Sequence, residues 1–279
     1  MKLIIGGVRG SYPVAQPDFM KYGGETTSML IEGAAGERLL IDAGTGVRDL
    51  GARLARDNAT REVLLLMTHY HLDHVVGLPS LGLIYDPQWT VRIAAPSHDE
   101  FDVGATMTRI MDKPFWPLQM SDLRANIHFD SLGGAPYRWG GLEIRWCMLH
   151  HPGGCTAYRV DEPATGASLV LATDVEWAAS SLEEQKQLIE LCTKPAPAAL
   201  LLMDAQYEAS EYEAHRGWGH SVWTEALDLA RLAGIRQVRM IHHDPAKNDS
   251  ALDRLNAEIT TASPSAALAR AREELMIAP

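Results

Sequence analysis

The sequence is poor in cysteine and contains no long apolar run. Its three cysteines, Cys147, Cys155 and Cys192, show no C-x-x-C spacing. This pattern predicts neither a disulfide framework nor a cysteine-based zinc site, and it favours a reducing compartment. No apolar stretch reaches the about 18 residues of a membrane-spanning helix, and the N-terminal apolar run is too short for a signal peptide. We therefore expect a soluble, cytoplasmic protein without a membrane partner.

Basic residues are also scarce relative to acidic ones. The chain has 25 Lys and Arg against 36 Asp and Glu, which gives a net charge of -11. Avid, nonspecific binding to nucleic acid or to an anionic membrane is driven by basic residues. The charge therefore argues against a nucleic-acid partner and favours a small-molecule substrate.

Apolar residues, in contrast, are abundant. They make up 46% of the 279 residues, which is enough to bury a substantial core. The length lies at the upper end of what one α/β domain usually contains. We expect one domain over residues 1–279.

The most informative segment places four potential metal ligands within six positions. The pattern is H-x-H-x-D-H, formed by His69, His71, Asp73 and His74. In an extended chain residues two apart point the same way, so His69 and His71 can face one ion and the next two ligands a second. Imidazole together with carboxylate suits zinc or a similar divalent transition metal better than calcium or magnesium. A chance cluster of surface histidines is the weaker interpretation, because the whole chain has only 11 histidines.

Apolar runs and helix signals alternate along the chain and predict an α/β fold. The predicted strands cover residues 2–6, 28–32, 38–41, 62–67, 91–94, 125–129, 142–149, 156–160, 168–172, 199–203 and 237–241. The predicted helices cover residues 47–56, 98–111, 180–192, 221–233, 248–261 and 264–275. A Gly-Ala-Ala-Gly loop predicts a hairpin between the second and third strands. The three strands between residues 142 and 172 resemble an antiparallel meander.

An aromatic segment, Pro114-Phe115-Trp116-Pro117, follows the helical pattern of residues 98–111. Exposed aromatic side chains beside a metal cleft could stack on a nucleobase or on another flat group. Buried aromatic side chains that anchor a loop are the commoner case. The sequence leaves open whether this segment is a lid.

Further ligand candidates each follow an apolar, strand-like run. They are His150 and His151, Asp174, Asp204, and His242 and His243. Such strand ends can converge at one edge of a sheet. Alternation allows only one histidine of each adjacent pair to face a shared site, and it does not decide which one. Asp174 could instead cap a helix and Asp204 a turn, and His220 in a Gly-Trp-Gly-His sequence could have a capping or core role.

Taken together, these motifs resemble those of the metallo-β-lactamase fold superfamily of metal-dependent hydrolases. Within it, the chain is most similar to the phosphodiesterase branch related to ribonuclease Z and the PhnP-type enzymes. The motifs that carry the resemblance are residues 7–11, 22–27, 42–46 and 68–74, and His242. The resemblance implies a four-layer αβ/βα sandwich with the metals along one sheet edge.

The resemblance also implies two divalent metal ions, zinc first and manganese or iron as alternatives. The implied ligands are His69, His71 and His151 for the first ion, Asp73, His74 and His242 for the second, and Asp174 for both. His220 would stabilise the scissile phosphate or protonate the leaving group, and Asp204 would pair with it. Loss of Asp73 should remove the second ion and most of the activity.

The implied function is hydrolysis of a phosphodiester, such as a small linear or cyclic nucleotide. The chain differs from particular members of this superfamily in three features, which limit the functions that the resemblance implies. The chain lacks the long basic arm with which ribonuclease Z grips transfer RNA, it has His71 where flavo-diiron relatives have Glu, and true β-lactamases lack a counterpart of His220. Hydrolysis of carboxyl esters, thioesters or lactones is the alternative, followed by a noncatalytic metal-dependent ligand sensor. Dimers are common among similar proteins, so a homodimer is left open.

Overall fold

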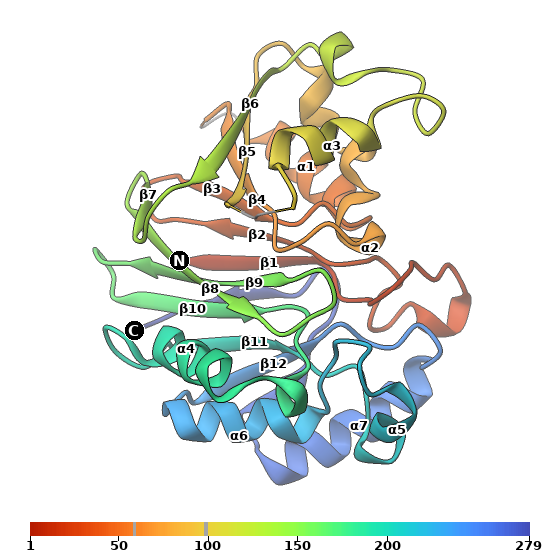
Figure 1. The fold of residues 1–279 in the computed structure, drawn as a ribbon, viewed down its shortest axis with the longest axis vertical. Helices are drawn as coiled ribbons and strands as arrows, with labels where there is room; N and C mark the ends of the chain where they lie inside the picture. Colours follow the sequence, from red (N-terminus) through yellow and green to blue (C-terminus); the bar gives the residue numbers. More distant parts are fainter. Residues whose placement is uncertain (58–59, 98–99) are drawn as a thin grey trace.

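A computed structural model describes residues 1–57, 60–97 and 100–279. Within these residues, two seven-stranded sheets stack face to face, and helices lie on the outer side of each sheet (Figure 1). This arrangement confirms the predicted four-layer sandwich.

The first sheet combines the six N-terminal strands with the last strand of the chain, and the second is built from the strands between them. In spatial order, the first sheet contains β14 (Glu274–Met276), β1 (Lys2–Gly7), β2 (Ser28–Glu32), β3 (Arg38–Ile41), β4 (Glu62–Leu66), β5 (Thr90–Pro96) and β6 (Asn126–Leu132). The second contains β13 (Ala266–Leu268), β12 (Gln237–Ile241), β11 (Leu200–Asp204), β10 (Ala167–Ala172), β9 (Cys155–Glu162), β8 (Leu142–Leu149) and β7 (Tyr137–Trp139). The predicted hairpin β2–β3 and the antiparallel meander β8–β9–β10 are both present.

The helices are divided between the two outer layers. They are α1 (Val47–Arg56), α2 (Leu72–Val75), α3 (Val103–Ile110), α4 (Leu182–Thr193), α5 (Ala209–His215), α6 (Trp223–Ala233) and α7 (Asp249–Ala262). Helices α1 and α3 lie on the side of the first sheet, and α4, α6 and α7 on the side of the second (Figure 1). No helix in the described ranges is long and apolar enough to cross a membrane.

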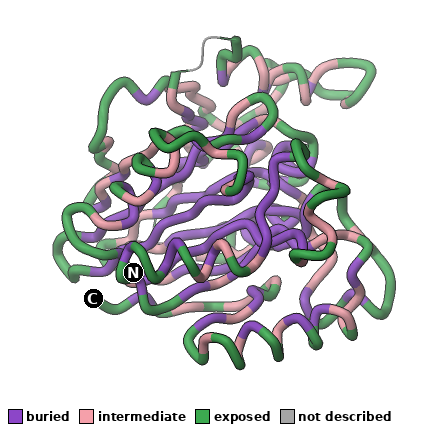
Figure 2. The backbone as a smooth tube through the Cα atoms, turned by 60° about the horizontal axis from the view of Figure 1, so that its bottom comes forward, coloured by how far each residue is buried: buried purple, intermediate pink, exposed green. Residues whose placement is uncertain are grey.

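Three apolar layers hold this sandwich together. Between the sheets, fully buried side chains such as Ile5, Leu66 and Leu171 pack against one another. The outer helices bury one face each, through residues such as Leu54 of α1 and Leu229 of α6. Figure 2 shows the consequence, with buried strands inside and exposed helix faces outside. Apolar burial is the main stabilising contribution to folding. The packing of these layers therefore holds the strands, and with them the strand ends, in fixed positions.

Strand β4 leads directly into the histidine motif. It is parallel to both of its neighbours, β3 and β5, and its residues 63–66 are fully buried. A parallel strand that is covered on both faces needs a continuous apolar run rather than an alternating one. The apolar sequence before His69 is therefore the reason why the motif begins at a strand end.

The second sheet brings further strand ends to one edge. Strands β10, β11 and β12 are parallel neighbours, and β8 runs in the same direction because β8 and β10 are both antiparallel to β9. The carboxyl ends of these four strands therefore lie at the same edge, as the sequence predicts.

The C-terminal region corrects one prediction. Residues 264–275 are predicted as a helix, but they contribute to β13 and β14, which pair with β12 and β1. Alanine favours a helix locally, yet Ala266 and Leu268 are buried against the second sheet, and this tertiary pairing outweighs the local preference. The predicted helix over residues 98–111 starts at His98, which lies outside the described residues. Strand β7 and helix α5 were not predicted.

Candidate metal centre

The candidate metal centre lies where the loops after β4, β8, β10 and β12 meet. The structure brings together all the ligands that the resemblance implied: His69, His71, Asp73, His74, His151, Asp174 and His242. They fall into small groups whose potential ligand atoms lie within 4.8 Å of one another. Six of the seven side chains are buried, and His71 is the exposed one.

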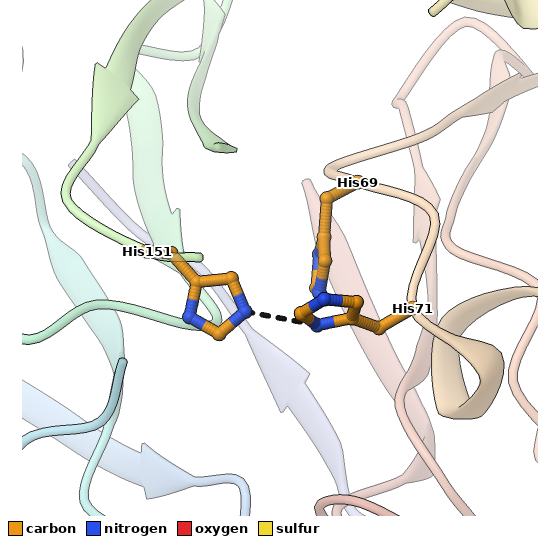
Figure 3. A group of neighbouring side chains, drawn as sticks. All are labelled: His69, His71 and His151. Atoms are coloured by element: carbon orange, nitrogen blue, oxygen red, sulfur yellow. Dashed lines mark hydrogen bonds between the residues drawn. The ribbon is translucent and has the colours of Figure 1, made fainter. Parts of the chain in front are cut away.

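Three histidines form the first group, as Figure 3 shows. His69 and His71 come from the loop after β4, and His151 approaches from the loop after β8. The His151 Nε2 atom lies 3.0 Å from the His71 Nδ1 atom, and the ring of His69 lies 4.9 Å from that of His151. Three converging imidazoles are a suitable partial ligand set for zinc.

The second group combines one carboxylate with two histidines. Asp73 and His74 lie in α2, and His242 directly follows β12. The Asp73 Oδ2 atom lies 3.3 Å from the Nε2 atoms of both His74 and His242. These three side chains could hold a second ion beside the first.

Asp174 lies between the two groups. Its carboxylate oxygens are 3.7 Å from His69 Nε2 and 3.9 Å from His151 Nε2 in the first group. The same carboxylate is 3.2 Å from His74 Nε2 and 3.1 Å from His242 Nε2 in the second group. A carboxylate in this position can contact two ions at once.

Hydrogen bonds at the Nδ1 atoms orient four of the histidines. His74 is paired with the Asp42 carboxylate at 2.8 Å, and His242 with the Gln206 side-chain oxygen at 2.8 Å. The Thr68 hydroxyl and the Gly219 carbonyl oxygen lie 3.0 and 2.9 Å from the Nδ1 atoms of His69 and His151. Such partners fix the imidazole ring and leave Nε2 available to a metal.

The sequence analysis missed two of these supporting residues, Asp42 and Gln206. Asp42 belongs to the motif of residues 42–46 that carried the resemblance, so a signal for it was present. It is fully buried, its φ is 58°, and it also accepts hydrogen bonds from the Thr68 amide and hydroxyl. Gln206 lies two residues after Asp204 and offers no motif of its own.

Several buried polar atoms support a metal in this place. The Nε2 atoms of His69 and His74 and the Oδ1 atom of Asp174 are buried without a hydrogen-bond partner. His74 Nε2 and Asp174 Oδ1 lie 3.2 Å apart but form no hydrogen bond. Burial of a polar atom without a hydrogen bond costs about 1–3 kcal/mol, so these neighbouring atoms need compensation. Divalent ions would satisfy all three atoms at once, and the mixture of imidazole and carboxylate fits such ions.

The ionisation states of the side chains in the centre also favour the binding of metal ions. Burial lowers the pKa of His151 to about 4, so its imidazole is neutral and able to bind a metal at neutral pH. Burial also acts to lower the pKa of His242, but Asp174 and Asp73 outweigh it and raise this pKa to about 10. The Asp73 pKa lies well below its usual range because His74 and His242 outweigh the effect of burial. The carboxylates are thus ionised and attract positive charge, which divalent ions would supply.

The structure distinguishes between the members of the two histidine pairs. His150 is partly exposed and lies 3.5 Å from Glu184, away from the centre. His243 is buried but faces the Ala269 carbonyl oxygen at 2.8 Å. His242 has a φ of 63°, a left-handed conformation that costs a residue with a side chain about 1–2 kcal/mol and that recurs at functional sites.

His220 and Asp204 form a pair next to the two groups. The His220 Nδ1 atom lies 2.7 Å from the Asp204 Oδ2 atom, and Asp204 is fully buried. The His220 ring stacks on that of His242 with 4.6 Å between the centroids. A ring nitrogen of His220 also lies within 4.8 Å of ligand atoms of His151 and Asp174. His220 is therefore close enough to contact a substrate bound at the centre.

Glu176 holds the loop that carries His220, and the sequence analysis missed it. Its buried carboxylate accepts hydrogen bonds from the amides of Gly217 and Gly219 and from the Tyr212 hydroxyl, at 2.8 to 3.1 Å. Gly219 has a φ of 90°, and a Cβ atom there would lie 2.2 Å from His151 Nδ1. Gly219 thus permits a close approach to His151, and Glu176 fixes the loop in that position.

Replacement of Glu176 by glutamine should weaken this loop. An uncharged amide offers one acceptor oxygen for three donors, so we expect the free energy of unfolding to fall by about 1–3 kcal/mol. Urea unfolding of the metal-saturated protein measures the change. The same substitution at exposed Glu183 is the matched control and should change the unfolding free energy by less than about 0.5 kcal/mol. Equal stability of the two variants would contradict the role given to Glu176.

The fold and the site define a metal-dependent hydrolase. Residues 37–243 match the family described as the Beta-lactamase superfamily domain, and the chain belongs to this family. A ribonuclease Z from Metallosphaera sedula is 25% identical to the chain over 250 residues, which cover 74% of this chain and 79% of that protein.

Two solved structures are similar over nearly the whole chain. The metallo-beta-lactamase fold protein YhfI from Bacillus subtilis has a TM-score of 0.71 and 18% identity, and covers 99% of both chains. A diphosphatase from the PhnP family has a TM-score of 0.70 and 14% identity, and covers 99% of this chain and 97% of its own. At these identities the likeness establishes the fold, which agrees with the predicted one.

Proposed function

We propose that the protein is a phosphodiesterase with two divalent metal ions. The observation that carries the proposal is the His220–Asp204 pair beside the two ligand groups, because a phosphodiester needs both stabilisation of the phosphoryl oxygens and a proton for the leaving group. The names of a relative and of a structural neighbour, a ribonuclease Z and a diphosphatase, support phosphoester chemistry.

In the proposed site, His69, His71 and His151 would hold one ion and Asp73, His74 and His242 the other, and Asp174 would contribute to both. Zinc suits this set of imidazoles and carboxylates. The bound ions supply Lewis acidity and a water of lowered pKa.

The remaining steps belong to the chain itself. His220 donates a hydrogen bond to the phosphate or a proton to the departing oxygen. Asp204 holds the His220 ring through Nδ1 and leaves Nε2 free for the substrate.

The substrate is proposed as a small phosphodiester, with nucleotides, cyclic forms included, as one class. The acidic charge of the chain argued against a nucleic-acid partner. The ribonuclease Z relative does not support that expectation. RNA is itself a phosphodiester, so short RNA belongs in the substrate panel.

Hydrolysis of bis(p-nitrophenyl) phosphate tests the proposal. The protein is purified without added metal, analysed for its metals, and assayed with zinc or manganese and after treatment with a chelator. We expect turnover that the chelator abolishes and that added metal restores. Inert protein with two ions bound, or protein that cleaves thioesters or lactones but no phosphodiester, would refute the proposal.

A further inference from the structure

A large cavity opens directly onto the first ligand group. Its volume is about 650 Å³, and its lining includes His69 and His71 as well as residues 152–154, next to His151. Cavities of this size hold drug-sized molecules. Because the cavity and the candidate metal centre share two histidines, a group that fills the cavity can be covalently attached to a phosphate at the centre.

Most of the remaining lining of this cavity comes from three segments. Tyr70, Leu72 and Val76 lie at the histidine motif, Thr106, Arg109 and Ile110 in α3, and Phe101, Phe115 and Trp116 in the segments on either side of α3. Helix α3 lies on the same side of the first sheet as α2 (Figure 1). The Pro114–Pro117 segment thus contributes its two aromatic side chains to a wall beside the candidate metal centre.

The wall of the cavity is predominantly apolar and aromatic. Phe115 is 79% exposed and Leu72 64% exposed, although exposure of large apolar side chains in one place is unfavourable. Tyr70 and Phe101 already meet edge to face, with 6.1 Å between ring centroids. Aromatic walls favour flat ring systems, because stacking adds to the gain from apolar burial.

The charges along the cavity restrict the ligand further. The lining contains the two histidines and the positively charged Arg109. No carboxylate of the described residues lines the cavity. Arg109 disfavours a cationic group and tolerates a neutral or anionic one. His220 does not belong to this lining and stacks instead on His242, so the cavity and the proposed proton donor serve different sides of the substrate.

We propose that this cavity binds one ester group of the phosphodiester, and that this group is a flat aromatic ring system without positive charge. The proposal rests on the proposed phosphodiesterase function. A simple aryl group and a nucleobase share the required chemistry.

Four singly charged phosphonate monoesters distinguish these groups. Methyl methylphosphonate lacks a large group, methyl cyclohexylphosphonate has a bulky group that is not flat, methyl phenylphosphonate has an aryl ring, and thymidine 5′-methylphosphonate has a nucleobase. Calorimetry with the metal-saturated protein measures their dissociation constants. We expect the two aromatic compounds to bind about 10- to 100-fold more tightly than methyl methylphosphonate. The cyclohexyl compound should bind more tightly than methyl methylphosphonate but more weakly than either aromatic compound. The tighter of the two aromatic compounds identifies the source of the ring.

Variants of the wall connect this preference to the cavity. We expect Phe115→Ala and Ile110→Ala to reduce the advantage of the aromatic compounds over methyl methylphosphonate at least threefold. The matched control is Leu182→Ala, since Leu182 is also exposed but lies outside the cavity, and it should leave all four dissociation constants unchanged.

The outcomes separate this inference from the proposed function. Equal binding of all four compounds by a protein that hydrolyses bis(p-nitrophenyl) phosphate would overturn the inference alone. Cyclohexyl binding as tight as phenyl binding, or an aromatic advantage that survives both variants, would overturn it as well. Absence of both hydrolysis and phosphonate binding would overturn the proposed function.

Discussion

Replacement of Asp174 by alanine is expected to remove both metal ions and to lower phosphodiester hydrolysis by at least about 10³-fold. The Asp174 carboxylate lies 3.1 to 3.9 Å from Nε2 atoms of both ligand groups. Its removal would leave mainly imidazoles in the centre, with too little negative charge to balance the positive charge of the metal ions. Elemental analysis of the metal content and the rate with bis(p-nitrophenyl) phosphate measure the two effects.

The Asp73→Ala variant provides the contrast. Asp73 contacts His74 and His242 of the second group only, so this variant should keep about one ion per chain and lose most of its activity. Exposed Asp228 serves as the matched control, and Asp228→Ala should keep two ions and full activity. If the Asp174 variant retained two ions, or if it retained about one ion as the Asp73 variant should, the bridging position of Asp174 would be wrong.

Much of this fold was predictable because its local signals agree with its tertiary structure. The apolar run before His69 is buried on both faces of β4, and Gly234, directly after the predicted helix of residues 221–233, ends α6 with a positive φ of 70°. Helix α4 begins with a capping box, a local signal in which Ser181 and Glu184 exchange hydrogen bonds. Residues 264–275 were mispredicted because their pairing partners are β12 and β1, and local sequence carries no information on such distant contacts.

For the candidate site, the candidate ligands that are close in sequence were predictable from their spacing, but the choice between the distant histidines was not, and neither were the supporting residues. The spacing of His69, His71, Asp73 and His74 announces a metal centre by itself. Alternation could not choose between His150 and His151, because the choice depends on the turn after β8 and on the Gly219 carbonyl oxygen 68 residues away. Supporting residues such as Glu176 act through backbone amides, and hydrogen bonds to the backbone leave no side-chain pattern to recognise.

Replacement of His220 by alanine should reduce kcat by about 10²- to 10⁴-fold when the leaving group needs a proton. His220 lies near both ligand groups, and its Nδ1 atom is held by the fully buried carboxylate of Asp204. The loss should be smaller for a leaving group that is stable as an anion. We therefore expect a greater loss with diphenyl phosphate than with bis(p-nitrophenyl) phosphate, because p-nitrophenolate departs more readily than phenolate. The ratio of the two kcat values in each variant is the measurement.

This ratio separates proton donation by His220 from a purely structural role. A structural defect would lower the two kcat values by the same factor, and that result would contradict the assignment. Asp204→Asn should show the same dependence on the leaving group with a smaller loss, about tenfold, because the asparagine retains an acceptor for Nδ1 but loses the charge-assisted hydrogen bond that orients the ring. His128 in β6 lies away from the candidate metal centre, and His128→Ala should preserve both rates and their ratio.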